Sequence, residues 1–191
     1  MDLVLASQSP RRRQLLEQLG LTFRCEPADV DESWVDGEDP VTYVARVAQL
    51  KADAIAERFG RADDICVVAA DTTVDLDGEI LAKPDDDAHA RSMLRSLSGR
   101  AHQVHTAVVG WSTTASRTAT VTTDVSFVEL SDADIDWYLS LGEHRDKAGA
   151  YGMQTAGGVF VDRIDGSPSN VIGLPLAETA EILRTCGLPL G

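Results

Sequence analysis

Residues 65–83 read ICVVAADTTVDLDGEILAK. The run at residues 65–70 is continuously apolar and bounded by polar residues, which predicts a strand buried on both faces. We expect that strand to end at Asp71, and Asp77-Gly78 predicts a hairpin turn between two further short strands. Open α/β sheets place ligand chemistry at the carboxyl ends of buried strands. Asp71 is therefore a candidate to hold a divalent cation or to activate a water molecule, and its plain alternative is a strand-end cap.

Helices and strands alternate on both sides of this stretch. Apolar runs and period-two alternation predict strands at residues 3–6, 102–111, 118–130 and 159–164. Helical spacing of apolar residues predicts helices at residues 10–20, 40–60, 84–97, 131–141 and 175–186. The acidic residues 29–39 show no period and predict a loop. Interleaved elements with one antiparallel block indicate an α/β or α+β fold with a mixed sheet, in a single domain over residues 1–191.

The charge balance of the chain is strongly acidic. It carries 17 lysines and arginines against 31 aspartates and glutamates, a net charge of −14. Such a surface repels nucleic acids and anionic membranes, so we expect neither as a partner. The sequence shows no signal-peptide pattern and no long apolar stretch, which predicts a cytoplasmic protein. Cys25, Cys66 and Cys186 are widely spaced without a C-x-x-C motif and predict reduced structural thiols.

Three arginines stand out against this acidic background, in the segment SQSPRRR at residues 7–13. Ser9 predicts an N-cap and Pro10 the first helical residue, and the free backbone N–H groups at a helix N-terminus attract anions. Guanidinium groups match phosphate oxygens in shape and charge. Successive helical residues diverge by about 100°, so one or two of the three arginines can face a single ligand. A solvated helix face explains the cluster equally well.

Three further polar residues are candidates for ligand contacts. Lys83 follows the predicted hairpin and could supply a point charge for phosphate, and Lys51 falls at the edge of the apolar stripe of its helix. Gln154 lies in the glycine-rich segment DKAGAYGMQTAGG at residues 146–158, where close backbone approach and an amide group suit a nucleobase edge. Their plain alternatives are a surface lysine, a lysine that extends past an apolar face to solvent, and a flexible turn.

Together these segments resemble the Maf family of nucleoside triphosphate pyrophosphatases, first associated with septum formation. The resemblance rests on LASQSPRRRQLLEQLG, YVARVAQLKADA, AADTTVDLDGEILAKP, LRSLSG, DKAGAYGMQ and NVIGLPLAET, which stand in one colinear order over nearly the whole chain. It implies an elongated α/β fold with a cleft, shared with the inosine triphosphate pyrophosphatases. It also implies hydrolysis of a nucleoside triphosphate to the monophosphate and pyrophosphate, a divalent metal (Mg²⁺, Mn²⁺ or Co²⁺) and a homodimer.

The resemblance also implies roles for single residues by their motif positions. Asp71 corresponds to the family's proton acceptor, and we expect it to hold the metal together with Glu32. The family's phosphate and metal cluster falls on Ser7, Arg12, Glu32, Lys51 and Lys83. Arg13 stays a candidate substrate contact because it belongs to the arginine run, and its alternative is a structural role.

Three positions indicate the substrate class within the resemblance. Arg11, Thr72 and Gln154 match the branch that looks like dTTP/UTP pyrophosphatases, whereas the branch acting on 7-methyl-GTP carries an aromatic residue and a glutamine at the first two positions. We expect Thr72 and Gln154 to hydrogen-bond the O4 and N3–H edge of thymine or uracil. The alternatives are a nucleotide-binding regulator of division without turnover and a pyrophosphatase for another non-canonical nucleotide.

Overall fold

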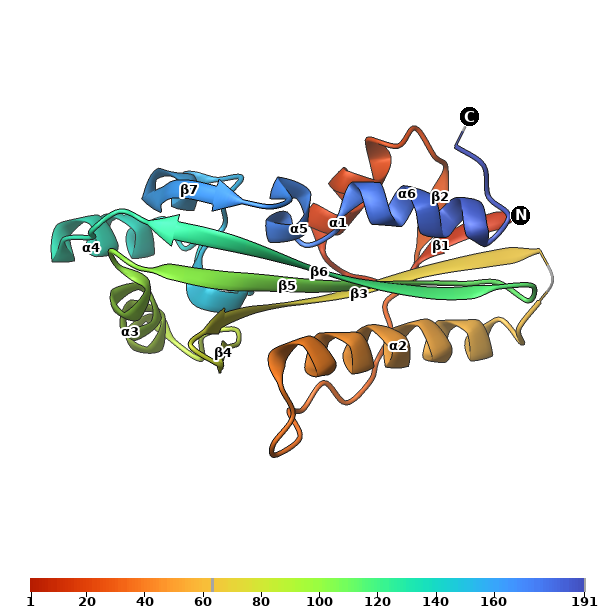
Figure 1. The fold of residues 1–191 in the computed structure, drawn as a ribbon, viewed down its shortest axis with the longest axis horizontal. Helices are drawn as coiled ribbons and strands as arrows, with labels where there is room; N and C mark the ends of the chain where they lie inside the picture. Colours follow the sequence, from red (N-terminus) through yellow and green to blue (C-terminus); the bar gives the residue numbers. More distant parts are fainter. Residues whose placement is uncertain (63, 191) are drawn as a thin grey trace.

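One mixed sheet runs the length of an elongated molecule, with helices on both of its faces (Figure 1). The computed structural model describes residues 1–62 and 64–190. The strands are β1 Asp2–Leu5, β2 Phe23–Cys25, β3 Ile65–Leu76, β4 Glu79–Leu81, β5 Ala101–Trp111, β6 Ser116–Phe127 and β7 Val161–Asp165. Their order is β2-β1-β3-β5-β6-β7, with β4 attached to β3. β1 is parallel to β2 and β3 and the other described pairs are antiparallel, which confirms the predicted α/β fold with a mixed sheet.

Of the helices in the described chain, α1 to α5 each begin after a residue whose side chain caps them. They are α1 Pro10–Glu17, α2 Pro40–Arg58, α3 Asp87–Leu97, α4 Asp132–Ser140, α5 Pro168–Ile172 and α6 Leu176–Thr185, with 3₁₀ helices η1 Ala148–Ala150 and η2 Ala156–Phe160. Ser9, Asp39 and Ser131 cap α1, α2 and α4 through side-chain oxygens that accept backbone N–H groups. β2, α5 and the 3₁₀ helices were not predicted, because such short segments show no period. None of the helices described is both long and apolar enough to cross a membrane.

β3 differs from its prediction in a way that matters for function. We expected it to end at Asp71, but it continues without a break to Leu76, so the expectation that Asp71 ends a strand is wrong. The reason is that β5 pairs with β3 along residues 67–75 and carries the backbone past the polar side chains. On the other edge of β3, β1 pairs with the residues up to Val68, and β4 pairs with the residues from Val74 onward. Within the described chain this leaves a gap between the two strands, and Asp71 lies in the gap.

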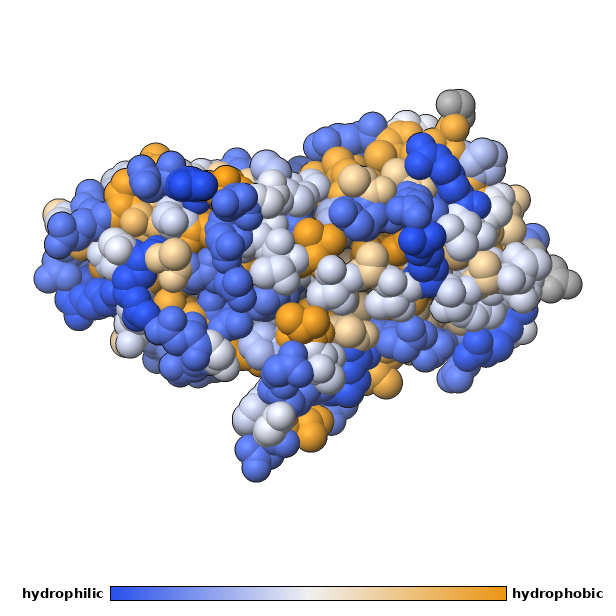
Figure 2. Space-filling model, viewed as in Figure 1, coloured by the Kyte–Doolittle hydropathy of each residue, from blue (hydrophilic) through white to orange (hydrophobic). Residues whose placement is uncertain are grey.

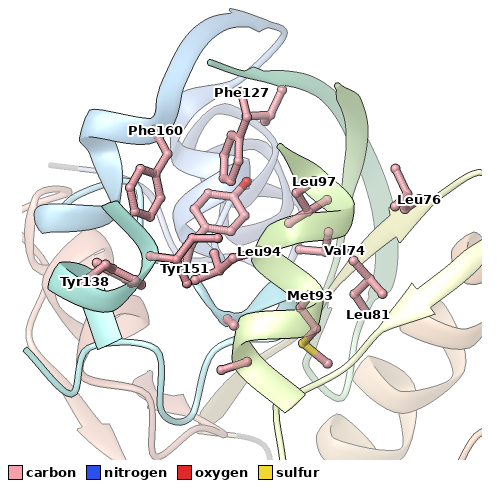
Figure 3. Packing of buried hydrophobic residues seen from close by; sticks show 14 of the residues in the cluster. Val74, Leu76, Leu81, Met93, Leu94, Leu97, Phe127, Tyr138, Tyr151 and Phe160 are labelled. Carbon is pink, nitrogen blue, oxygen red and sulfur yellow. The ribbon is translucent and has the colours of Figure 1, made fainter. Parts of the chain in front are cut away.

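Aromatic side chains fill the core beside α3 at one end of the sheet (Figure 3). Phe127 and Tyr151 pack edge to face with ring centroids 4.7 Å apart, and Tyr138 and Phe160 do so at 5.0 Å. His102 is buried beside them, with its ring centroid 4.9 Å from that of Phe127 and its Nε2 2.9 Å from the Tyr151 hydroxyl. Burial lowers the pKa of His102 to about 4.

Acid is therefore expected to destabilise the fold through His102. In the folded chain the His102 imidazole has a pKa of about 4 and stays neutral above that pH, whereas in the unfolded chain the same imidazole has the ordinary pKa of 6.5. The unfolded state binds more protons in that window, so the free energy of unfolding falls by roughly 3 kcal/mol as the pH drops from 6.5 to 4. Urea unfolding of the wild type and of His102→Phe across this window measures the effect. An equal pH slope in the two proteins would contradict it.

Candidate functional site

A cleft of about 700 Å³ opens at the gap that β1 and β4 leave along the edge of β3. Its walls come from the start of α1, the loop before α2, the end of β4 and the segments at residues 146–154 and 171–173. The predicted site residues that line it are Ser7, Arg11, Arg12, Glu32, Lys51, Asp71, Thr72, Lys83 and Gln154. The fold thus brings together side chains that stand far apart in the sequence.

Lys51 joins the two carboxylates predicted for this site. Its Nζ lies 2.8 Å from Asp71 Oδ1 and 3.0 Å from Glu32 Oε1. Lys51 is only 7 % exposed, because α2 packs its apolar face, including Ala48 and Ala52, against β3 and β5. The side chain therefore enters the cleft at the edge of that face, which excludes the alternative of a lysine that extends to solvent.

Asp71 is a buried ionisable group with charged neighbours. It is 6 % exposed, and burial raises the pKa of its carboxyl group, while the positive charges of Lys51 and Arg12 oppose that rise. A carboxylate whose pKa is raised toward neutral pH is a better proton acceptor than an ordinary surface carboxylate. Burial with specific charge partners in a cleft is the pattern typical of catalytic carboxylates.

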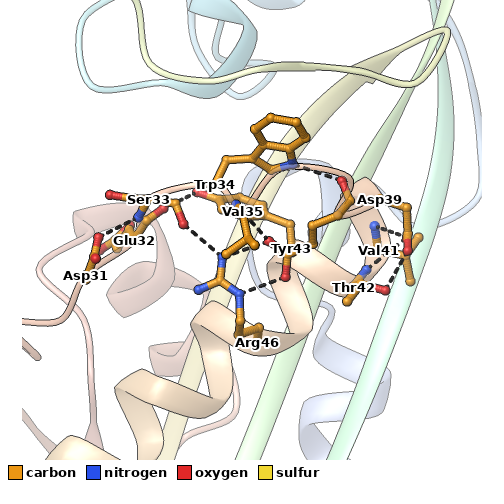
Figure 4. Close-up of polar contacts among 11 residues, drawn as sticks. Asp31, Glu32, Ser33, Trp34, Val35, Asp39, Val41, Thr42, Tyr43 and Arg46 are labelled. Atoms are coloured by element: carbon orange, nitrogen blue, oxygen red, sulfur yellow. Dashed lines mark hydrogen bonds and ion pairs between the residues drawn. The ribbon is translucent and has the colours of Figure 1, made fainter.

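Glu32 belongs to a hydrogen-bonded loop (Figure 4), and its carboxylate contacts Lys51. The Tyr43 hydroxyl donates to the Glu32 carbonyl at 3.0 Å. Arg46 donates to the Ser33 carbonyl at 2.9 Å and to both carboxylate oxygens of Glu38 at 2.7 and 2.8 Å. All these donors come from the first two turns of α2, so the loop is fixed to the helix that also carries Lys51. The loop projects from the body below the start of α2, and Figure 2 shows hydrophobic and hydrophilic groups side by side on it.

Arg12 is held inside the cleft by two hydrogen bonds. Its Nε donates to the Gly173 carbonyl at 2.9 Å and its Nη2 donates to Thr72 Oγ1 at 3.0 Å. Burial lowers the pKa of Arg12, and the charge of Asp71 opposes that shift. Arg11 reaches the cleft on the other side of α1, where its Nη2 donates to the Asp146 carbonyl at 3.4 Å. Two of the three arginines are therefore oriented toward one cavity.

Arg13, the third candidate substrate contact of the run, does not share this orientation. It is exposed on the outer side of α1, and its Nε lies 3.9 Å from Glu17 Oε1 one turn later. The divergence of about 100° per residue explains why a third consecutive arginine turns away from a cleft that receives the first two. Arg13 thus follows the solvated-face alternative.

Lys147 is a cleft residue that the sequence did not single out. Its aliphatic chain lies over Gly152, where an added Cβ would come within 2.7 Å of Lys147 Cε. Burial lowers the pKa of the Lys147 ammonium group. The signal was present, because Lys147 belongs to the same DKAGAYGMQ segment as Gln154. Lys83 and Gln154 are both exposed at the rim of the cleft, where each can turn toward a ligand.

The carboxylate pair determines what metal the site can hold. Among residues 1–62 and 64–190, no three His, Cys, Asp or Glu side chains converge as a ready metal cage. Glu32 and Asp71 nevertheless converge on one point, since both contact Lys51 Nζ. Mg²⁺ is commonly bound by one or two carboxylates together with substrate phosphates and water. The two carboxylates therefore suit a divalent cation that phosphate groups of a ligand help to hold.

Comparison with known proteins gives three findings. The model of the family described as "Maf-like protein" matches residues 2–186. The dTTP/UTP pyrophosphatases of Anaeromyxobacter dehalogenans (strain 2CP-1) and Methylobacillus flagellatus are 54% and 50% identical to this chain, covering 98% and 97% of it and 95% and 93% of their own length. The solved structure of the Staphylococcus aureus Ham1 protein is 17% identical, with a TM-score of 0.49 over 66% of this chain and 72% of that one.

Proposed function

The chain belongs to the Maf-like protein family, and from this membership and its cleft we propose that it hydrolyses pyrimidine nucleoside triphosphates to the monophosphate and pyrophosphate. dTTP and UTP are the proposed substrates, with modified pyrimidine nucleotides as further members of the class. The relatives named dTTP/UTP pyrophosphatase support the substrate class. The observation that carries the proposal is the buried Lys51, which joins Asp71 and Glu32 inside a cleft lined with cations.

Positive groups lining the cleft provide the charge that a triphosphate needs. They are Arg11, Arg12, Lys51, Lys83 and Lys147. Their gathering is informative because the whole chain carries a net charge of −14. The Ser7 hydroxyl and the Arg11 N–H at the start of α1 supply donors to phosphate oxygens, whereas the N–H groups of Ser9 and Arg12 already donate to Ser7 Oγ and Ser9 Oγ. Neutralising and positioning the phosphates are the main requirements of phosphoanhydride hydrolysis.

Asp71 is the proposed proton acceptor. Its carboxylate takes a proton from the water that attacks the α-phosphorus, the bond to the bridging oxygen breaks, and pyrophosphate leaves. The charge of Lys51 favours the ionised form of Asp71 and so opposes the effect of burial on its pKa. A divalent cation (Mg²⁺, Mn²⁺ or Co²⁺) held by Glu32 and Asp71 would neutralise phosphate charge when bound.

Thr72 and Gln154 are the proposed contacts to the nucleobase. Both line the cleft, and they come from different elements, β3 and the segment after η1. Uracil and thymine present an O4 acceptor beside an N3–H donor, a pattern that cytosine reverses. A buried site built for one pattern leaves polar groups unpaired when it binds the other, which is the physical basis of such selectivity.

A matched pair of arginine variants tests the phosphate assignment. Arg12→Ala is expected to lower kcat/KM for dTTP by roughly 10- to 100-fold, because it removes charge-assisted hydrogen bonds to phosphate. Arg13→Ala is expected to stay within twofold of the wild type, since its side chain is on the outer side of α1. Pyrophosphate release in the presence of Mg²⁺ measures both. Equal losses in the two variants would show that the arginines act only through the stability of α1.

Turnover itself separates the proposal from its alternative. Incubation of the wild-type protein with dTTP and Mg²⁺ is expected to give dTMP and pyrophosphate, and a screen of triphosphates ranks the substrates. Tight binding of dTTP without product would instead support a nucleotide-binding regulator. The homodimer and the cytoplasmic location stay predictions, which sedimentation and cell fractionation check.

A further inference from the structure

A chain of hydrogen bonds runs from the cleft into the protein interior. Arg12 Nη2 donates to Thr72 Oγ1 at 3.0 Å. Thr72 Oγ1 lies 2.9 Å from Thr106 Oγ1, and Thr106 Oγ1 donates to the Asn170 carbonyl at 3.0 Å. Thr72 and Thr106 are register partners on β3 and β5, so their side chains share one face of the sheet. Thr106 and Asn170 are fully buried, which places the inner part of the chain out of reach of solvent.

Counting protons fixes the direction of every bond in this chain. A hydroxyl group has one proton and two acceptor positions, a carbonyl oxygen only accepts, and a guanidinium only donates. Because the Asn170 carbonyl cannot donate, the Thr106 proton points to it. Thr106 Oγ1 can then only accept a hydrogen bond from the Thr72 hydroxyl. The Thr72 proton therefore points toward Thr106, away from the cleft. Since Arg12 occupies one acceptor position of Thr72, a single acceptor position is left for the cleft.

We propose that Thr106 is a specificity-determining positioning residue, which forces Thr72 to present an acceptor and never a donor to the bound nucleobase. This inference rests on the proposed function. An acceptor at Thr72 pairs with the imide N3–H of uracil or thymine. With cytosine, the same Thr72 oxygen meets the unprotonated N3, which is also an acceptor, so two lone pairs repel each other. To bind cytosine, Thr72 must turn its proton to the cleft and give up its bond to Thr106, a loss of roughly five- to tenfold in affinity.

The surroundings of Asn170 hold the inner end of the chain in place. Its Nδ2 donates at 2.9 Å to both the Val104 carbonyl and Thr123 Oγ1, from β5 and β6. The Asn170 carbonyl also accepts from Gly173 N–H at 2.9 Å. Removing the Thr106 hydroxyl therefore leaves that carbonyl with a partner. Thr106→Val, which is close to isosteric, releases the Thr72 proton without creating an orphaned acceptor.

The test compares uracil and cytosine nucleotides in matched variants. Thr106→Val is expected to raise the ratio of CTP to UTP kcat/KM by roughly five- to tenfold, while UTP turnover stays within a few-fold of the wild type. Thr106→Ser restores the hydroxyl and is expected to restore the wild-type ratio. Thr179→Val is the control, because Thr179 is equally buried and donates to a backbone carbonyl, Pro175, at 2.7 Å on α6. If Thr106→Val does not fold, Thr106→Ala is the test variant in its place.

Binding of the product nucleotides provides a readout that does not depend on turnover. The ratio of CMP to UMP affinity, measured by calorimetry, is expected to rise in Thr106→Val by the same factor. Unchanged ratios in Thr106→Val and Thr106→Ala would overturn the role of Thr106, even if the wild type hydrolyses UTP. A rise of the same size in Thr179→Val would overturn it as well. Failure of the wild type to hydrolyse dTTP or UTP would overturn the proposed function alone, since the affinity ratios still decide the role of Thr106.

Discussion

Asp71→Asn is expected to lower kcat for dTTP hydrolysis by roughly 100- to 10,000-fold, the range for loss of a positioned proton acceptor. Asparagine keeps the shape of the side chain and one oxygen toward Lys51, whose Nζ lies 2.8 Å from Asp71 Oδ1. It cannot take a proton from the attacking water. The expected signature is therefore a fall in kcat with little change in KM, measured as pyrophosphate release under saturating and limiting dTTP.

A neighbouring carboxylate on the same strand provides the control for this result. Asp75 lies four residues further along β3 on the same face, and its Oδ2 contacts His105 Nε2 at 3.1 Å outside the cleft. Asp75→Asn is expected to keep near-normal turnover. Thermal unfolding of both variants shows whether the fold is intact. Near-normal kcat in a folded Asp71→Asn protein would remove Asp71 from the chemistry.

Lys51→Met is expected to have the second largest effect, a loss of at least about 100-fold in kcat/KM at pH 7. The change removes a cation from the phosphate site and also the nearest positive charge to Asp71. That charge opposes the rise in the Asp71 pKa, so its loss raises this pKa further. The acidic limb of the pH profile of kcat/KM, which reports the free enzyme's base, should therefore move to higher pH.

The shift of the pH profile separates this role from simple loss of phosphate binding. A residue that only bound phosphate would lower kcat/KM equally at every pH. Lys51→Arg keeps the positive charge and is expected to keep the position of the acidic limb, even if the larger group lowers the rate. An acidic limb that does not move in Lys51→Met would contradict the coupling between Lys51 and Asp71.

Much of the secondary structure could be predicted because its causes are local. Ser9, Asp39 and Ser131 cap helices within three residues of themselves, and the turn at Asp77-Gly78 needs only the positive φ angles of those two residues. The error at β3 has the opposite origin. A strand ends where its partners end, and β5, whose Ala107 pairs with Asp71, continues alongside β3 past the polar side chains.

The residues of the candidate site also fall into those that the sequence could identify and those that only the fold could. Motif order alone selected residues that the fold gathers in one cleft, because the resemblance spans the whole chain. It placed Arg12 in the phosphate cluster but left Arg13 between a substrate contact and a structural role, since that choice depends on which side of α1 faces the cleft. Lys147 was passed over for a related reason. Only the fold of the chain around Gly152 shows that its stem is buried against the cleft.

The amino-acid sequence by itself determined the starts of α1, α2 and α4, the buried character of β3, the mixed α/β class and the set of polar residues available for chemistry. These follow from hydrophobic period, capping and charge, which act over a few residues. The tertiary structure decided that Asp71 faces a gap between β1 and β4, that Lys51 joins it to Glu32, and that Thr106 directs the Thr72 proton inward. Each of these depends on strand register and helix packing between distant segments, and such contacts are set by burial of the whole chain rather than by any local pattern.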